Sequence, residues 1–371
     1  MMKTTLLLMF LLWVLAYFVQ AQEPALFPVK KNDKAGYIDQ TGKVVIPLKF
    51  DEAWGFAEGL APVRVGEDWG YTNKKGEIVI KPQFFQADSF SEGIASVGIY
   101  WPRRKIIDAT VGYYGYVDKN GRVITKDKFD VAFDFSNGLA MIQTEDSKDG
   151  FIDHTGKIVL YFDAWSGFSN DRAMFKTNSN MPDSKIGYID KTGNVVIPAQ
   201  YHFGTNFLEG LACVSKEKGF GYIDTEGNTK IDFVFDGCDV FSEGLAAVRV
   251  DGKYGFIDES GKMVIEPQFA EVRPFSDGAA IVRIGEPEKP TEDGLRDVTI
   301  TPERNMTVAK DGVYGVIDKT GKFIIPPRFV QIGSFYDGLA WVNLSDSYLV
   351  HGETDQWGYV NKKGVIVWKS F

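Results

Sequence analysis

Short apolar runs recur along this chain at a nearly fixed spacing, and turn residues separate them. The stretch YGFIDESGKMVIEPQF, residues 254–269, has close variants at residues 69–84 and 314–329. Each stretch is rich in β-branched and aromatic residues and contains an Asp or Asn followed three residues later by Gly. Such runs, bounded by turn residues, are typical of strands, so we predict β-hairpins rather than helices.

Nine copies of the hairpin can be aligned on the glycine that stands between its first two large residues. These anchor glycines are Gly36, Gly70, Gly115, Gly150, Gly187, Gly221, Gly255, Gly315 and Gly358. Four of the eight intervals are 34 or 35 residues, so the basic period is about 34 and the longer intervals carry insertions. A fixed period of this size indicates a repeat architecture.

Each copy contains three apolar segments and a linking phrase. The segments read Gly-Leu-Ala-x-Val (residues 244–248), aromatic-Gly-aromatic (residues 220–222) and a β-branched run (residues 44–46), which predicts a three-stranded antiparallel meander. The linking phrase, Phe-x-x-Ala-x-x-Phe-Ser-Glu-Gly, is seen at residues 84–93. Its two phenylalanines are expected to fill the gap between meanders. The pattern leaves open whether the phrase is a fourth strand or an irregular crossing.

Two recurrent polar positions are interpreted as turn residues. An Asp carboxylate between the second and third segments can accept a backbone N–H two residues on, and the following Gly can take a positive φ. This predicts turn caps at Asp39, Asp118, Asp153, Asp190, Asp224, Asp258 and Asp318, with Asn73 and Asn361 as substitutes. The acidic or amide residue of the Ser-Glu-Gly phrase is assigned to a turn as well: Glu58, Glu92, Asn137, Glu209, Glu243, Asp277 and Asp337.

From about residue 26 to the C-terminus the array resembles the WG-repeat family, also called KWG repeats, which is common in bacterial exported proteins. The Trp-Gly pair survives only at residues 69–70 and 357–358, and Tyr or Phe replaces the Trp in four other copies. The resemblance implies a β-rich repeat scaffold and carries no catalytic residues.

We therefore predict an all-β chain of about nine antiparallel three-stranded meanders, in one of two arrangements. An open, curved β-superhelix is favoured, because the period is shorter than a four-stranded propeller blade of ~40–45 residues. The alternative is a closed β-propeller. In an open array the terminal edges need protection from pairing with other strands, and charged residues suit this role: Lys30, Lys31, Asp33, Lys34 and Lys369.

The first 21 residues have the layout of a secretory signal peptide. Lys3 precedes an apolar run, and Val19 and Ala21 are the small residues of a cleavage site. We expect cleavage after Ala21 and a mature array, residues 22–371, that is secreted or periplasmic and has no stable membrane insertion. An uncleaved anchor helix is the alternative, although the apolar run is slightly short for a bilayer span.

The charge of the chain excludes one class of function, and its cysteine content bears on its disulfide bonding. With 41 Lys and Arg against 50 Asp and Glu, the net charge of -9 argues against nucleic-acid binding, which needs clustered cations. The two cysteines, Cys213 and Cys238, are compatible with one disulfide that cannot be read from the sequence. The preferred interpretation is a free thiol at Cys238, because alanines occupy its position in other copies.

No catalytic, metal-binding or cofactor-binding residue is predicted. The three histidines, His154, His202 and His351, have no common spacing, and no local nucleophile motif or metal-ligand spacing appears. The repeated carboxylates argue against catalysis, because an active site needs one special pair whereas a turn needs the same residue in every copy.

Three insertions interrupt the repeat, at residues 98–113, 283–313 and 343–356. Insertions in repeat arrays often build the binding face, although tolerated surface loops are the alternative. The first insertion carries Trp101, Arg103 and Arg104, residue types that dominate protein interfaces. The leading hypothesis is an exported, non-enzymatic scaffold for a protein partner. Glycan binding through exposed tryptophans is second (Trp54, Trp101 and Trp165), and a cell-envelope hydrolase is third.

Overall fold

The computed structural model describes residues 24–100, 112–164, 166–177, 183–217, 219–285, 313–344 and 356–371. The predicted signal peptide, residues 1–21, lies outside this part of the chain. All regular structure in the described residues is β-strand, and every strand pair is antiparallel, so the all-β prediction is confirmed. No described segment is a helix of the length and apolarity needed to cross a bilayer.

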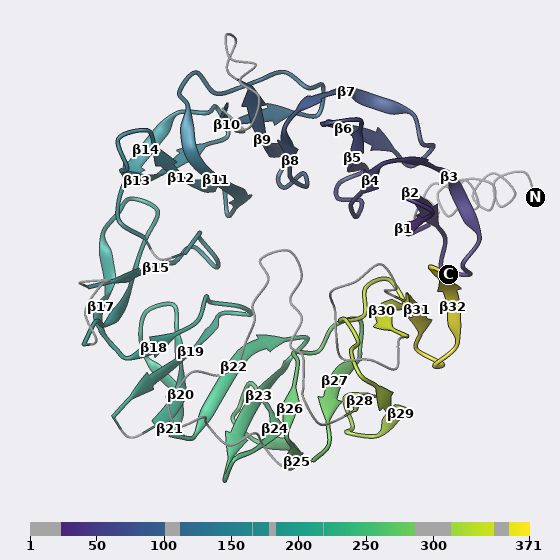
Figure 1. The fold of residues 1–371 in the computed structure, drawn as a ribbon. Coiled ribbons are helices and arrows are strands. Elements are labelled where there is room, and N and C mark those ends of the chain that lie inside the picture. The colour runs from purple at the N-terminus through teal and green to yellow at the C-terminus, as the bar shows by residue number, and fades with distance from the viewer. Residues whose placement is uncertain are drawn as a thin grey trace, which may run out of the picture.

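The described strands form nine consecutive units (Figure 1). Units 1 to 3 are β1 (Phe27–Lys31), β2 (Lys34–Ile38) and β3 (Val44–Phe50); β4 (Glu52–Ala53), β5 (Leu60–Val65), β6 (Asp68–Asn73) and β7 (Ile78–Phe84); β8 (Gln86–Ala87), β9 (Ile94–Tyr100) and β10 (Gly112–Asp118). Units 4 to 6 are β11 (Phe129–Ser136), β12 (Leu139–Thr144), β13 (Asp149–Asp153) and β14 (Ile158–Tyr161); β15 (Ala173–Lys176), β16 (Ile186–Ile189) and β17 (Val195–Tyr201); β18 (Phe203–Gly204), β19 (Leu211–Lys216), β20 (Gly219–Asp224) and β21 (Thr229–Phe235). Units 7 to 9 are β22 (Gly237–Ser242), β23 (Leu245–Val250), β24 (Lys253–Asp258) and β25 (Met263–Phe269); β26 (Glu271–Val272), β27 (Ala280–Arg283), β28 (Tyr314–Ile317) and β29 (Phe323–Phe329); β30 (Leu339–Asn343), β31 (Trp357–Asn361) and β32 (Ile366–Lys369).

A complete unit contains four strands, which we name inner, first, middle and outer. In unit 2 these are β4, β5, β6 and β7, and the order in the sheet is the order in the chain. The linking phrase therefore supplies the inner strand, which answers the question that the sequence pattern left open. Most inner strands have two residues, whereas β11 and β22 are longer. One pairing between β10 and β11 joins units 3 and 4 into a single seven-stranded sheet.

In units 1, 2, 5, 6, 7 and 8 the anchor glycine of the middle strand faces a bulge in the outer strand. In unit 6 Phe220 pairs with Phe235 but Tyr222 pairs with Ile231, so the outer strand has two extra residues opposite Gly221. A Cβ atom on Gly221 would lie 2.6 Å from the carbonyl oxygen of Ile231. The glycine of the repeat is thus required by close backbone approach, because any side chain would collide with the outer strand.

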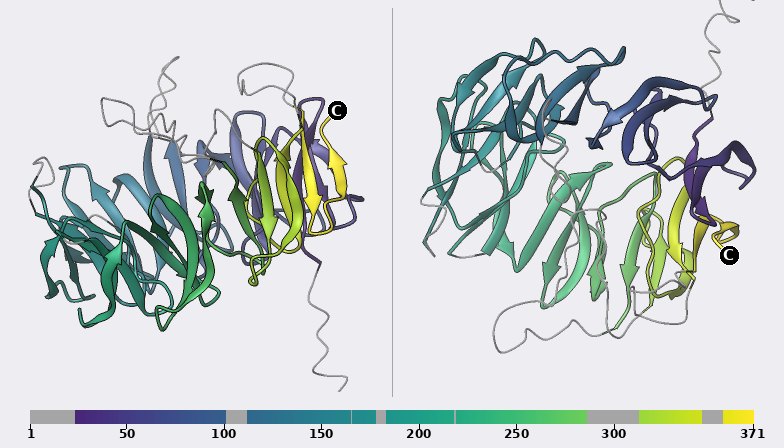
Figure 2. Two further views of the ribbon diagram at one scale, coloured as in Figure 1. Left: turned by 90° about the horizontal axis from the view of Figure 1, so that it is seen from below. Right: turned by 45° about the horizontal axis from the view of Figure 1, so that its top comes forward.

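The units follow one another around a ring, with inner strands toward the centre and outer strands on the rim (Figure 1). Figure 2 shows the ring from two other directions, with neighbouring sheets stacked face to face. Each hydrophobic cluster draws on two neighbouring units. Between units 2 and 3, Tyr71 and Ile80 contact a set that includes Phe90 and Val97. Phe84 and Phe90 of the linking phrase are both 3% exposed in this cluster, as expected for residues that fill the gap between sheets.

No sheet closes into a barrel, and the first and last units lie side by side. Phe27 and Val29 of β1 share a buried cluster with Leu339 of β30 and, around it, Trp357 and Val367. Gln40 donates a hydrogen bond to the carbonyl of Asp337, 297 residues away. The array of meanders is as predicted, and its two terminal sheets cover each other. As favoured from the sequence, no described strand pairs across the two ends of the array, and side-chain contacts bring its first and last units together.

The preferred interpretation of the cysteines is wrong, because Cys213 and Cys238 form a disulfide with a Cα–Cα distance of 5.9 Å. Cys213 is on β19 of unit 6 and Cys238 on β22 of unit 7, so the bond crosses between two sheets. Cys238 does occupy the alanine position of the linking phrase. The alanine position faces the first strand of the preceding unit, and Cys213 lies on that strand. The sequence of one unit does not reveal which residues of the next unit it contacts, so the pairing could not be predicted.

Candidate functional site

The predicted turn caps share one geometry. In each, the Asp Oδ1 atom accepts a hydrogen bond from the backbone N–H two residues on and a second from the N–H four residues on. For Asp190 these bonds, from Thr192 and Asn194, measure 2.9 and 3.0 Å. The same pair of bonds is made by Asp39, Asp118, Asp153, Asp224, Asp258 and Asp318, and by Asn73 and Asn361.

Hydrogen bonding keeps these carboxylates ionised. The Thr192 hydroxyl and the two backbone N–H groups lower the pKa of Asp190 to about 2. At Asp39 and Asp318 the neighbouring threonine hydroxyl likewise lowers the pKa. A carboxylate held in its charged form by three donors is a poor general acid, so this arrangement suits a turn cap rather than proton transfer.

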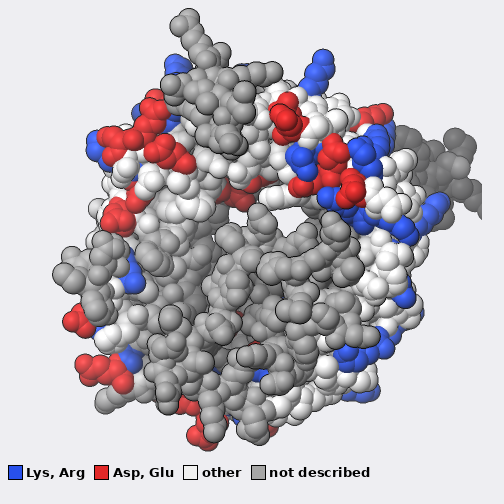
Figure 3. Space-filling model, viewed as in Figure 1, with Lys and Arg blue, Asp and Glu red and all other residues white. Residues whose placement is uncertain are grey.

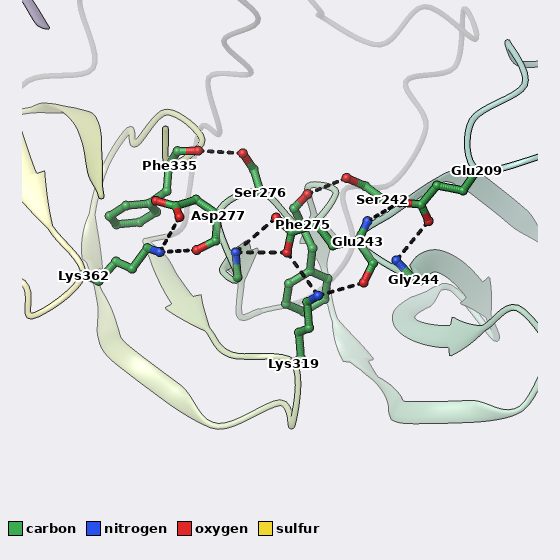
Figure 4. Close-up of polar contacts among 11 residues, drawn as sticks. Glu209, Ser242, Glu243, Gly244, Phe275, Ser276, Asp277, Lys319, Phe335 and Lys362 are labelled. Carbon is green, nitrogen blue, oxygen red and sulfur yellow. Dashed lines mark hydrogen bonds and ion pairs between the residues drawn. The ribbon is translucent and has the colours of Figure 1, made fainter. Parts of the chain in front are cut away.

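The Ser-Glu-Gly position does more than form a turn. Glu58, Glu92, Glu209 and Glu243 adopt positive φ angles of 50–55°, as a tight hairpin turn requires. Their side chains then reach the next unit, where each accepts a hydrogen bond from the backbone N–H of the corresponding turn. Glu209, for example, accepts from the N–H groups of Glu243 and Gly244 at 2.7 and 2.9 Å (Figure 4). We call this contact the seam clamp.

A cation completes several seam clamps. Lys319, in the Asp-x-x-Gly turn of unit 8, donates to the carbonyl of Glu243 at 2.8 Å and pairs with its carboxylate at 3.2 Å (Figure 4). Lys362 of unit 9 makes the same contacts with Asp277, and Lys119 of unit 3 makes them with Glu58. Gln40 of unit 1 bonds the carbonyl of Asp337 in the same way at 2.7 Å. The bond to the turn carbonyl is therefore also present between the last unit and the first.

Serine and tyrosine side chains add two further kinds of hydrogen bond between units. Ser242 donates to the carbonyl of Phe275, and Ser276 donates to that of Phe335, at 2.7 and 2.6 Å (Figure 4). On the middle strands, Tyr222 donates to the carbonyl of Asp239 at 2.8 Å, and its burial raises its pKa well above the usual range. Neither role was predicted from the sequence. The signal was present in the joint repetition of Ser, Glu and Tyr at one period.

The residues predicted to bind a partner lie outside the described part of the chain. This holds for Trp101, Arg103 and Arg104, for Trp165 and for most of the three insertions. The strands that flank each insertion show at which point of the ring the insertion begins. All three interrupt the hairpin between a first and a middle strand: β9 and β10, β27 and β28, and β30 and β31. The first strands concerned, β9, β27 and β30, each start at a turn of the Ser-Glu-Gly position. Turns of this kind contact one another from unit to unit, so the three hairpins open on the opposite face of the ring.

The described histidines do not form a common site. His154 stands in a seam clamp, where its Nε2 atom lies 2.9 Å from Oε2 of Glu92 and its ring stacks on Phe135. His202 lies beside Lys185, two units away. His351 is outside the described residues. Among the described residues, no group of three His, Cys, Asp or Glu side chains is placed to hold a metal ion.

Acidic and aromatic residues lie on or beside the inner strands, which are on the central side of the ring (Figure 1). Asp88, just after β8, and Asp134, on β11, come from neighbouring units. Surrounding protein and the charge of Asp88 raise the pKa of Asp134 to about 6, although its side chain is exposed. Asp88 accepts a hydrogen bond from the Ser96 hydroxyl. Trp54, 41% exposed, lies edge-on to Trp69 with ring centroids 5.6 Å apart.

The resemblance inferred from the sequence is confirmed by comparison with known families. Eight segments match the model of the WG containing repeat: residues 36–67, 69–99, 114–148, 150–180, 186–219, 220–254, 254–286 and 314–348. No curated protein matches the chain.

Three solved structures align with this chain at low sequence identity. BamB from Moraxella catarrhalis is 12% identical over 70% of this chain and 91% of its own, with a TM-score of 0.36. Dihydro-heme d1 dehydrogenase NirN in complex with DHE is 12% identical over 82% and 73%, with a TM-score of 0.40. Apo AztD from Citrobacter koseri is 14% identical over 65% and 84%, with a TM-score of 0.35.

Proposed function

The chain belongs to the WG containing repeat family, and from that premise we propose that it is an exported, non-enzymatic scaffold that binds a protein partner. The observation that carries the proposal is that all three insertions leave the ring at equivalent hairpins and therefore on one face. Variable loops gathered on one face of a regular array are the usual way in which repeat proteins build a binding surface.

Two features support export as part of this proposal. The N-terminal 21 residues have the composition of a signal peptide. The Cys213–Cys238 disulfide is typical of an oxidising compartment such as the periplasm or the cell exterior. Both features support secretion or periplasmic residence of residues 22–371.

We assign the main partner contact to the insertion at residues 98–113. Its Trp101, Arg103 and Arg104 combine a large apolar ring with planar cations, the chemistry that contributes most to protein interfaces. Tyr100, where this insertion leaves β9, is 42% exposed and donates to Asp68 of unit 2. The base of the insertion is thus tied to the neighbouring unit.

The test is a pull-down from envelope extract with residues 22–371, beside a variant in which residues 98–113 are shortened to the basic repeat length. Mass spectrometry identifies the captured proteins. A matched control shortens residues 343–356, which leave the same face. A protein that is retained by the parent and the control but lost by the first variant supports the proposal. Identical capture by all three chains contradicts the assignment to this insertion.

Glycan binding is the second candidate, favoured by the exposed ring of Trp54 beside Trp69. A tryptophan with one accessible face can stack on a sugar ring. Retention on immobilised envelope glycans that is lost in Trp54→Ala would support this function, and retention that is unchanged would exclude Trp54 as the stacking residue. A hydrolase ranks third, because the repeated carboxylates are engaged in turns and seam clamps.

A further inference from the structure

Strand β1 has one hydrogen-bonding edge that no described strand covers. In other units an inner strand or bridge pairs with the first strand on this side, as β4 does with β5 and β26 with β27. In units 5 and 9 single bridges, Ala164 to Phe175 and Ile332 to Val342, occupy the position. Among the described residues β1 pairs only with β2. Figure 1 shows β1 on the central side of its sheet, so this edge faces the middle of the ring.

Pro24 excludes the hairpin through which the chain enters the first strand in other units. When unit 1 is aligned with the other copies, Pro24 takes the position of Glu58, Glu92 and Glu243. Those residues have φ angles of 50–55°, which the hairpin into the first strand requires. The proline ring holds φ near −65°, so this hairpin cannot form at Pro24. A strand on this edge must therefore reach it by another route.

The paired edges of units 2 and 8 indicate which residue types a strand docked on β1 would carry. Arg64 on β5 pairs with Glu52 of the inner strand, and their side chains form an ion pair of 2.6 Å. Arg283 on β27 pairs with Glu271 in the same way, at 2.7 Å. Lys30 holds the equivalent position on β1 and is exposed. A strand that pairs with β1 would therefore place an acidic residue opposite Lys30.

The next position of such a strand must be small. In unit 2 Ala53 follows Glu52 and pairs with Val63, whose equivalent on β1 is Val29. The disulfide shows that this side chain faces the first strand of the preceding unit, because Cys238 occupies it and contacts Cys213. For unit 1 the preceding unit is unit 9, where Trp341 stands at the position of Cys213. Because the indole is bulky, we expect glycine or alanine opposite it. Its buried Nε1 atom has no hydrogen-bond partner among the described residues.

The backbone groups for this pairing are also in place. In unit 2 the carbonyl of Pro62 accepts the N–H of Trp54 from the residue after β4. The equivalent carbonyl of Pro28 instead accepts the hydroxyl of Tyr359 at 3.1 Å. In other units this tyrosine bonds the carbonyl of the inner segment, as Tyr71 does with Asp88. A docked strand would restore both bonds, its N–H donating to Pro28 and its carbonyl accepting from Tyr359.

We propose that the central edge of β1, bounded by Trp341 and Tyr359, binds an extended segment of another protein in which an acidic residue precedes glycine or alanine. The segment adds as an antiparallel strand, a known mode of peptide recognition. Charge disfavours a second copy of this chain on the same edge, because Lys30 and Lys31 of the two copies would repel. Figure 3 shows Lys and Arg side chains recurring on the side of the ring where the first and last units meet. This site is separate from the insertion at residues 98–113.

The test uses residues 22–371 and a fluorescein-labelled peptide that copies residues 49–56, KFDEAWGF, which is the inner segment of unit 2. Fluorescence anisotropy should show saturable binding. Lys30→Glu should weaken it about tenfold, and a peptide carrying Glu52→Lys should bind this variant better than it binds the parent, because the charges are exchanged. Lys43→Glu, an exposed residue away from the edge, is the matched control and should leave binding unchanged.

A second variant keeps the proposal falsifiable if the peptide binds elsewhere. In this second variant a copy of residues 50–59, FDEAWGFAEG, is placed directly before Leu26. Unit 1 thereby gains an inner strand of its own. Circular dichroism checks its fold. The variant should melt at a higher temperature than the parent and should no longer bind the peptide. Binding that persists in it, or no saturable binding to the parent, overturns the proposal. Dimerisation of the parent that this variant loses would assign the edge to a second copy and would likewise overturn it.

Discussion

The hydroxyl of Tyr359 donates a hydrogen bond to the carbonyl of Pro28, and these residues stand 331 positions apart in the chain. Five other units place a tyrosine at the same position, and its hydroxyl always bonds the carbonyl 17 residues later, in the next unit: Tyr37, Tyr71, Tyr116, Tyr188 and Tyr222. In unit 9 the corresponding residue is Tyr359, whose hydroxyl reaches the first strand of unit 1. The two ends of the array are joined by the residue type that joins its interior.

Replacing Tyr359 should therefore destabilise the whole ring. Tyr359→Phe removes one buried hydrogen bond, which contributes ~1 kcal/mol to the free energy of unfolding. Tyr222→Phe removes the equivalent bond inside the array and is the matched comparison. Urea unfolding measures both losses. If Tyr222→Phe is destabilising while Tyr359→Phe is neutral, the terminal units do not contact each other in solution.

The anchor glycine should tolerate no side chain. Gly221→Ala would place a methyl group 2.6 Å from the carbonyl of Ile231, and the outer strand would have to shift. We expect a loss of roughly 1–3 kcal/mol, as for other overpacking substitutions. Gly55→Ala is the control, because a Cβ there meets nothing within 4 Å. Thermal denaturation of both variants checks the prediction, which fails if the two changes have equal effects.

The Cys213–Cys238 disulfide should stabilise the contact between units 6 and 7. It closes a loop with a sequence separation of 25 residues, for which chain entropy gives ~3 kcal/mol. Exchange of both cysteines for alanine, or reduction of the parent, should lower the free energy of unfolding by ~3 kcal/mol. The melting temperature should fall with it. Thiol titration of the unfolded, unreduced protein supplies the control, since two free thiols would show that the bond does not form.

Asp134 should make stability depend on pH near neutrality. A pKa raised to about 6 means that the folded protein holds this proton more tightly than the unfolded chain, where the value is near 3.8. The charged form is therefore destabilising above about pH 6, and this penalty disappears as the pH falls toward 4. Asp134→Asn should raise the melting temperature at pH 7.5 and leave it unchanged at pH 4. Asp130→Asn, on the same strand, is the control, and an equal rise in both variants would point to net charge alone.

Much of the unit could be predicted from sequence because its causes are local. The turn cap at Asp190 needs only N–H groups two and four residues away, and the hairpin needs only a glycine that accepts a positive φ. Alternation of β-branched residues with turns then determines the strands. None of these features depends on another unit, so the sequence of a single copy is sufficient to identify them.

The sequence by itself therefore determined the strands, their turns, the repeat and its family. The tertiary structure decided how the units meet: the disulfide between Cys213 and Cys238, the seam clamps and the contact of the first unit with the last. A small error in the rotation from one unit to the next accumulates over nine units, so the local pattern is compatible with both a ring and an open coil. Contacts between the two ends, such as the packing of Phe27 against Tyr359, distinguish them, because these side chains meet when the accumulated rotation brings the ends together.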